Sequence, residues 1–280
     1  MYTNSFVVGY YRKRVDANTM QYFLEISSLL GTENSIDDTE EKATLIANAL
    51  EETYGKEVEL SCEKSCSRVL EMLIHASDTN QVVSFLHRAS PNFPIISMDA
   101  SGSHVAEALL KAAAILLHDS DGGAAWFKTL NEGLQLICRV IQHIYNFFVK
   151  STFILKAIVS LNQLSLKYLA RFQYVGERAR DMMCSCYGSH VIRSLLSLLT
   201  GVKLEESSKK YGGRLTNRPD RLSHMQKLES IQKQGKFIFP DLFQLLAEKL
   251  LEAAKRNTLQ LCKDPFASPV LQVSMLEQKY

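Results

Sequence analysis

Proline and glycine are scarce in this chain, whose 280 residues include only 6 Pro and 13 Gly. Sandwiches and barrels need many turn residues, so this scarcity, together with long Leu-rich segments, favours helices. The hydrophobic content of 46% and the charged content of 22% are those of a globular protein. We therefore expect an all-α fold with enough length to bury a sizeable core.

Cysteine pairs of the kind that hold structural zinc are also missing. Cys62 and Cys66 are separated by three residues, and Cys184 and Cys186 by one, so neither pair has the spacing of a two-pair zinc site. We predict ordinary thiols, no metal site and no cofactor.

Catalytic motifs are likewise lacking, since no GxSxG, P-loop or HExxH pattern occurs. His104 and His190 each follow a serine, but adjacent residues on a helix point about 100° apart, which is poor geometry for a nucleophile and its base. We predict that the chain is not an enzyme.

No long uncharged apolar run is present either. The best candidate, residues 144–172, is interrupted by Lys150, Lys156 and Lys167, and the N-terminus is too polar for a signal peptide. We expect no membrane span.

The net charge is only +2, and residues 144–180 alone carry six Lys/Arg against one acid. The overall charge therefore gives no argument for RNA binding.

The chain does contain one short sequence motif in four versions, which we call the phrase. Ser67, Ser103, Ser189 and Ser268 mark equivalent positions in CEKSCSRVLEMLIHA, DASGSHVAEALLKAA, SCYGSHVIRSLLSLL and DPFASPVLQVSML. The first interval, 36 residues, is the period of a helical repeat, and the next two, 86 and 79, are each about two units. Apolar residues follow each serine at helical offsets, which predicts one buried helix face. The first of them is a valine two residues after the serine: Val69, Val105, Val191 and Val270.

Further amphipathic stretches near Thr44, Gln81, Leu130 and Asp241 suit partner helices, so the sequence predicts a solenoid of stacked helices. We expect an N-terminal extension over 1–14, repeats over 15–142, an atypical insertion over 143–180 and further repeats over 181–280. A polar loop is expected at about 205–236. Its basic residues fit either nucleic-acid binding or simple solvation.

Each phrase also carries a trio, defined as the serine, the residue after it and the residue four positions after it. Positions i and i+4 lie side by side on a helix, and we expect the trios to share one exposed surface. Two polar side chains can bond the edge of an unstacked base while a flat one stacks on its face. The alternative is that the serine is a helix cap and the i+4 residue is merely solvated. The candidate RNA-binding residues are Ser67, Arg68 and Glu71; Ser103, His104 and Glu107; Ser189, His190 and Arg193; and Ser268 and Gln272.

The phrases GSHVAEALL, from Gly102, and YGSHVIRSLL, from Tyr187, resemble the second-helix motif of Pumilio-type RNA-binding repeats, and specifically those of the nucleolar Nop9-type Pumilio (PUF) family. The resemblance implies a right-handed α-solenoid that binds single-stranded RNA, with a role on precursor ribosomal RNA of the small subunit in the nucleolus. It also implies a monomer, with pre-ribosomal proteins as further partners. Family members carry more repeats, so the chain is interpreted as a truncated or variant form.

By the same resemblance, Glu71 and Glu107 would each contact a guanine, beneath Arg68 and His104 as stacking residues. Arg193 departs from the usual pairings, which leaves the base at that trio open. Gln272 matches an adenine-type pair, but Pro269 replaces the flat stacking residue there, so we expect weaker contact or none. The alternative function is a protein-binding scaffold of the HEAT or armadillo kind.

Overall fold

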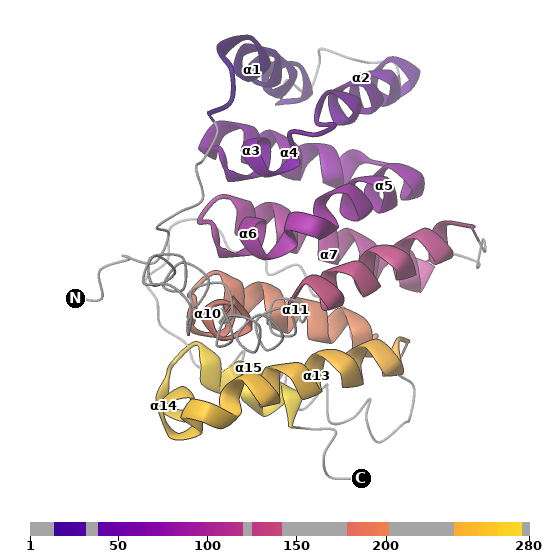
Figure 1. The fold of residues 1–280 in the computed structure, drawn as a ribbon. Helices are drawn as coiled ribbons and strands as arrows, with labels where there is room; N and C mark the ends of the chain where they lie inside the picture. Colours follow the sequence, from indigo (N-terminus) through magenta and orange to yellow (C-terminus); the bar gives the residue numbers. More distant parts are fainter. Residues whose placement is uncertain (1–13, 32–38, 120–124, 142–177, 202–237, 276–280) are drawn as a thin grey trace, which may run out of the picture.

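The computed structural model describes residues 14–31, 39–119, 125–141, 178–201 and 238–275, and within these ranges the chain is helical, with no strand (Figure 1). A further helix without a label in Figure 1 covers residues 125–141. The labelled helices are α1 (Ala17–Gly31), α2 (Thr39–Glu52), α3 (Glu57–Cys62), α4 (Lys64–Ala76), α5 (Thr79–Ala89), α6 (Phe93–Met98), α7 (Gly102–Asp119), α10 (Arg178–Cys184), α11 (Gly188–Thr200), α13 (Pro240–Ala254), α14 (Thr258–Lys263) and α15 (Ala267–Ser274).

The helices stack as repeating units along one axis. Each unit begins with a short helix (α3, α6, α10 or α14) and continues into a longer one (α4, α7, α11 or α15). We call α4, α7, α11 and α15 the central row, because α4 packs against α7, α7 against α11, and α11 against α15. The four predicted partner stretches form α2, α5, the helix over 125–141 and α13. The predicted all-α solenoid is therefore confirmed.

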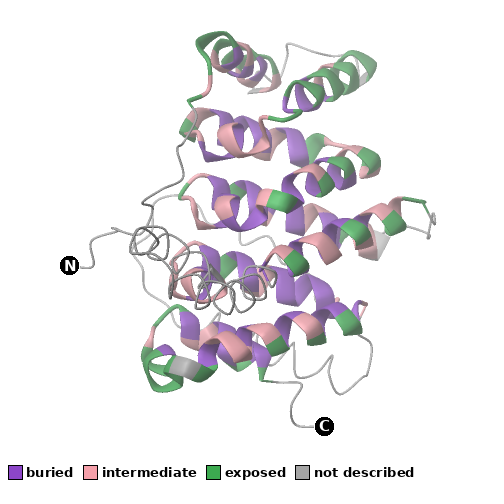
Figure 2. Cartoon of the chain, in the orientation of Figure 1, coloured by how far each residue is buried: buried purple, intermediate pink, exposed green. Residues whose placement is uncertain are grey.

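The core is one continuous apolar cluster that runs through all the units. Figure 2 shows the buried residues on the sides of the helices that face one another. The valine of each phrase belongs to this core, since Val69, Val105, Val191 and Val270 are at most 2% exposed. The apolar spacing in the sequence thus identified the buried face correctly.

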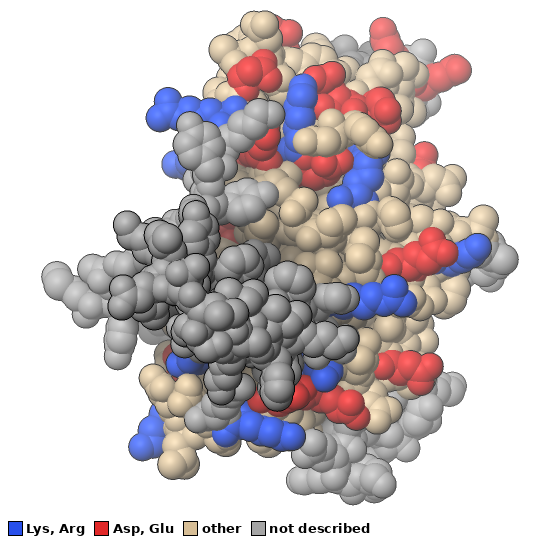
Figure 3. Space-filling view, viewed as in Figure 1, with Lys and Arg blue, Asp and Glu red and all other residues tan. Residues whose placement is uncertain are grey.

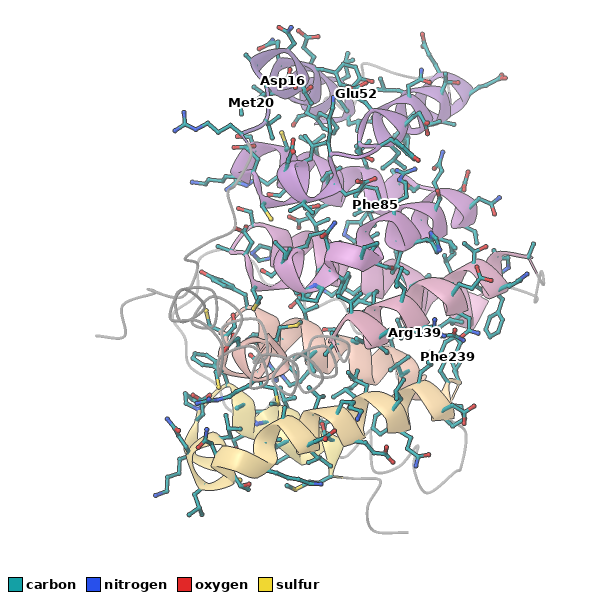
Figure 4. The ribbon with its side chains drawn as sticks, viewed as in Figure 1. Asp16, Met20, Glu52, Phe85, Arg139 and Phe239 are labelled. Carbon is teal, nitrogen blue, oxygen red and sulfur yellow. The ribbon has the colours of Figure 1, made fainter. Side chains whose placement is uncertain are left out.

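Successive units are also joined by polar contacts. The guanidinium of Arg88 on α5 donates from Nη2 to the Leu50 carbonyl oxygen and to Thr53 Oγ1, both at 3.0 Å. Its Nε donates to Glu57 Oε1 at 3.1 Å. Arg88 thereby ties the end of α2 and the start of α3 to α5. At the top of the stack, Asp16 caps α1 by accepting from the Thr19 N–H at 2.9 Å (Figure 4).

The two ends of segment 202–237 meet at the end of α11. The Phe239 N–H donates to the Leu199 carbonyl oxygen at 3.0 Å. Gly201 has φ +81° and ends α11, and an ideal Cβ there would lie 2.9 Å from the Ile238 side chain. The Phe239 ring (Figure 4) stacks on Phe127, with centroids 5.5 Å apart. Gly201 and Ile238, the described residues on either side of segment 202–237, are therefore in contact.

The predicted divisions of the chain are only partly visible. Of the insertion expected over 143–180, residues 178–180 begin α10, and the remainder lies outside the described residues. The polar loop expected at about 205–236 and all but Arg14 of the expected N-terminal extension lie outside them too. Within the described part of the chain, no helix is long and apolar enough to cross a membrane. Residues 144–172, the best candidate by sequence, lie entirely outside that part.

Candidate nucleic-acid interface

The central row brings the four trios onto neighbouring helices. Each trio begins in the first turn of its helix: the serine is the second residue of α7, α11 and α15 and the fourth of α4. Each of these helices touches the next one in the row. In the view of Figure 1, α13 lies in front of α15. Figure 3, drawn from the same side, shows acidic and basic side chains mixed on the visible surface, as the small net charge suggests.

A recurring cap fixes the register of every trio. Four residues before each serine, a side-chain oxygen accepts from the backbone N–H groups two and three residues further on. The four caps are Glu63 at 2.7 and 2.7 Å, Asp99 at 2.8 and 3.0 Å, Ser185 at 3.3 and 3.1 Å, and Asp264 at 2.9 and 2.8 Å. The serine N–H in turn donates to the backbone carbonyl of that capping residue. All four helices therefore start with the same geometry.

Sequence reasoning missed this cap, because it considered the trio serine itself as the capping residue. The signal was present: an acid or a serine stands four positions before each trio serine, at Glu63, Asp99, Ser185 and Asp264. These residue types are good acceptors for the free N–H groups of a helix start.

Two of the central helices pack very closely on the short helix that precedes them. An ideal Cβ at Gly102 would come within 2.4 Å of the Ile96 carbonyl oxygen, and one at Gly188 within 2.8 Å of the Met182 carbonyl oxygen. Only glycine permits this approach of α7 to α6 and of α11 to α10. Ser103 and Ser189 directly follow these glycines.

The expectation that every member of a trio is exposed is wrong for three serines. Ser67, Ser103 and Ser189 are only 2%, 4% and 1% exposed. Ser268 is half-buried. The hydroxyls of Ser67 and Ser103 donate to carbonyl oxygens of their own first turn, at 3.1 Å to Lys64 and 3.3 Å to Ala100. These hydroxyls retain only their capacity to accept.

The residue after each serine follows the prediction. Arg68, His104 and His190 are exposed, and Pro269 in the fourth trio is half-buried. Three of the four helices therefore present a flat side chain to solvent at the same position.

The long polar side chains of the first two trios lie among cations. Glu71 and Glu107 are both half-buried. Burial raises the pKa of the Glu71 carboxyl, while the nearby His104, His75, Lys111 and Arg68 act to lower this pKa. Two of these cations, His104 and Lys111, come from the next helix of the row. The first two trios are thus electrostatically coupled across the α4–α7 contact.

The third trio is organised differently. The half-buried Arg193 lies along its own helix, with Nη2 2.7 Å from His190 Nδ1 and Nε donating to the Ser189 carbonyl oxygen at 3.3 Å. Because a guanidinium only donates, His190 Nδ1 must be the acceptor, which leaves the proton of the neutral ring on Nε2. In the fourth trio, Gln272 is exposed.

Other ligand chemistries find little support in the described residues. No group of three or more His, Cys, Asp or Glu side chains in the described ranges could hold a metal ion. Burial raises the pKa of the Cys66 and Cys138 thiols to about 12 and that of Cys184 to about 11. These thiols stay protonated near neutral pH, and it is the thiolate that binds metals.

Known proteins share both this sequence and this architecture. The chain is 33% identical to Pumilio homolog 23 of Arabidopsis thaliana over 94% of its own length and 30% of the relative's. It is 26% identical to Nucleolar protein 9 of Debaryomyces hansenii over 92% of its own length and 35% of the relative's. The chain thus spans about a third of the length of these curated relatives.

Solved structures show the same correspondence. The structure of APUM23-GGAUUUGACGG matches with a TM-score of 0.64 at 30% identity, over 94% of this chain and 41% of that one. The structure of APUM23-GGAAUUGACGG matches with a TM-score of 0.63 at 32% identity, over 94% and 40%. The sequence profile of the NOP9-like PUF repeat domain matches residues 55–278, a range that contains all four trios. The chain therefore belongs to the NOP9-like PUF repeat family.

Proposed function

We propose that this chain binds single-stranded RNA along the central row and reads part of its sequence with the trios. The observation that carries the proposal is the recurrence of the trios in one register, fixed by four equivalent caps, on helices that touch one another. Family membership supports it, since the matched structures of APUM23 contain the sequences GGAUUUGACGG and GGAAUUGACGG.

The first two trios fit guanine. The Watson–Crick edge of guanine offers only donors beside its O6, namely N1–H and N2–H, and an ionised glutamate accepts two hydrogen bonds. The hydroxyls of Ser67 and Ser103 already donate to the backbone, so the small part of each that reaches the surface can only accept. Arg68 and His104 are exposed beside them and can stack on the base. The serine and the glutamate of these two trios are therefore suited to a donor-rich edge.

The other two trios differ in chemistry and should differ in preference. Arg193 supplies donors only and suits an acceptor edge or a phosphate. Gln272 both donates and accepts, which suits adenine or uracil, but Pro269 gives no flat ring to stack. We expect the strongest selectivity at the first two trios.

The cellular role that we propose is work on precursor ribosomal RNA of the small subunit in the nucleolus, in contact with pre-ribosomal proteins. The names of the relatives support this setting, because several are nucleolar proteins. We propose that residues 15–142 and 181–280 are two parts of one repeat array, with 143–180 as an insertion and 1–14 as an extension, and that the protein acts as a monomer.

The test is fluorescence anisotropy with labelled GGAUUUGACGG, the sequence in the APUM23 structure, and with variants in which each guanine in turn becomes adenine. Glu107→Gln removes one acceptor and should weaken binding by about 1–3 kcal/mol, roughly 5- to 150-fold. The loss should disappear when one particular guanine is already replaced.

The matched control is Glu248→Gln on α13, outside the central row, where the exposed carboxylate accepts from Gln244 at 3.0 Å. It removes the same charge and should leave binding unchanged. An equal loss on every RNA would point to lost folding or backbone contact instead. Folded protein that binds none of these RNAs would refute the proposal and favour a protein-binding scaffold.

A further inference from the structure

The residue eight positions after each trio serine varies together with the charge of the trio. A cation-forming residue stands there in the two trios with an acid, as His75 after Glu71 and Lys111 after Glu107. Where the trio has Arg193, the position is Ser197, which is buried and donates to the Arg193 carbonyl oxygen at 2.8 Å. Only the acid-bearing trios therefore carry a basic residue at this position.

Lys111 is the member of this set with contacts to two trios. Its Nζ lies 3.8 Å from Glu107 Oε2, one helical turn away on α7. The side chains of both residues are 27% exposed, so the pair is partly shielded from water. Because α4 packs against α7, Lys111 also acts on Glu71 of the neighbouring trio. One ammonium group thus lies within range of two carboxylates on adjacent helices.

We propose that Lys111 is a positioning residue for base selection, which holds the Glu107 carboxylate in place through their ion pair and favours the ionised form of the Glu71 carboxylate, so that both trios select guanine. This inference rests on the proposed RNA binding. Lys111 lies outside the trios and need not touch the base itself.

The charge of the carboxylate decides which base edge it fits. An ionised carboxylate only accepts and so matches the two donors of guanine. A protonated carboxyl has one donor and one acceptor, which matches the N6–H and N1 of adenine instead. Loss of the proton is therefore a condition for guanine selectivity at these two trios.

Glu71 is the carboxylate at greater risk of protonation, because burial raises its pKa. The groups that oppose this rise are Arg68 and His75 on α4 and His104 and Lys111 on α7. Lys111 is the member of this set that comes from α7 and also forms an ion pair with a trio carboxylate, that of Glu107.

The test compares Lys111→Met with wild type, using the anisotropy assay on GGAUUUGACGG and its single guanine-to-adenine variants. The expected loss is about two- to fivefold, smaller than that of Glu107→Gln, because a partly exposed ion pair contributes modestly. The loss should affect the guanines read by Glu71 and Glu107 and vanish on RNAs in which they are adenine. Lys111→Arg should restore wild-type binding.

A pH series from 5.5 to 8 supplies a second readout that a merely structural role would not move. As pH falls, protonation of the Glu71 carboxylate, whose pKa is raised by burial, should reduce the preference for guanine over adenine at the base that Glu71 reads. Removal of the Lys111 charge favours protonation, so in Lys111→Met this reduction should occur at a higher pH than in wild type.

The matched control is Lys249→Met on α13. Lys249 is 25% exposed and pairs with Glu252 at 2.8 Å, but it lies outside the central row. The control should leave affinity and its pH dependence unchanged. Wild type that binds no RNA would overturn the proposed function and this inference with it. Wild type that selects guanine while folded Lys111→Met keeps the same selectivity and the same pH profile would overturn this inference alone. If Lys111→Met fails to fold, Lys111→Gln provides the same two readouts.

Discussion

Replacing Gly102 with alanine would add a methyl group at the point where α7 meets the backbone of α6. An ideal Cβ there lies 2.4 Å from the Ile96 carbonyl oxygen and 3.2 Å from its carbonyl carbon. The same oxygen accepts from the Asp99 N–H at 3.2 Å, so it cannot turn aside without breaking that bond. Gly102→Ala must therefore push α6 and α7 apart.

The size of the effect follows from two opposing terms. Overpacking of a buried site typically costs about 1–3 kcal/mol. Alanine in place of glycine in a helix returns roughly 0.5–1 kcal/mol. The 2.4 Å approach to a backbone oxygen places this cost in the upper half of its range, so we expect a net loss of about 1–2.5 kcal/mol in the free energy of unfolding. For a chain of this size, this corresponds to a midpoint roughly 2–10 °C lower.

Thermal unfolding followed by circular dichroism measures this difference. Gly133→Ala is the matched control, because its Cβ would meet the end of the Leu86 side chain at 2.9 Å, and that side chain can rotate away. The control should shift the midpoint less than Gly102→Ala does. A Gly102→Ala protein as stable as wild type, or more stable, would show that the backbone contact does not constrain α7.

Further substitutions test the helix starts and the core. Asp99→Ala removes the acceptor for two backbone N–H groups and should reduce the free energy of unfolding, measured in urea, by about 1 kcal/mol. Asp264→Ala removes the equivalent acceptor and should have the same effect. An unchanged free energy of unfolding in either variant would argue against the cap. Val105→Asp places an unpaired charge at a position with 0% exposure and should abolish cooperative unfolding, whereas His104→Asp at the exposed neighbouring position should not. A folded Val105→Asp protein with wild-type stability would contradict the assigned core.

The repeat architecture was accessible from sequence because it depends on local spacing. The position of Val69 or Val191 relative to its leucines fixes a helix face without any knowledge of the neighbouring helix. The partner helices near Gln81 and Asp241 were predicted for the same reason. In each case, a 3.6-residue periodicity within one segment was sufficient.

The burial of Ser103 and Ser189 was not predictable in this way. It depends on how closely α7 and α11 approach the short helices before them, and this distance is set by Gly102 and Gly188 together with the backbone opposite. A glycine immediately before the serine was a visible hint. The sequence did not reveal which carbonyl group that glycine would meet.

The environment of Glu71 was also beyond sequence reasoning. Its helical neighbours Arg68 and His75 follow from spacing along α4. The influence of His104 and Lys111 requires knowledge of how α4 lies against α7. Contacts between repeats depend on the offset of one helix against the next. The residue pattern within a single repeat does not determine that offset.

The meeting of Leu199 with Phe239 has a consequence for protein engineering. Because the 3.0 Å hydrogen bond and the packing of Ile238 on Gly201 join α11 directly to the start of α13, the array should tolerate a change in the number of residues between them. Each doubling of that number should add only about 0.6 kcal/mol of closure entropy. A fluorescent reporter whose own termini lie close together could be spliced in there without separating α11 from α13.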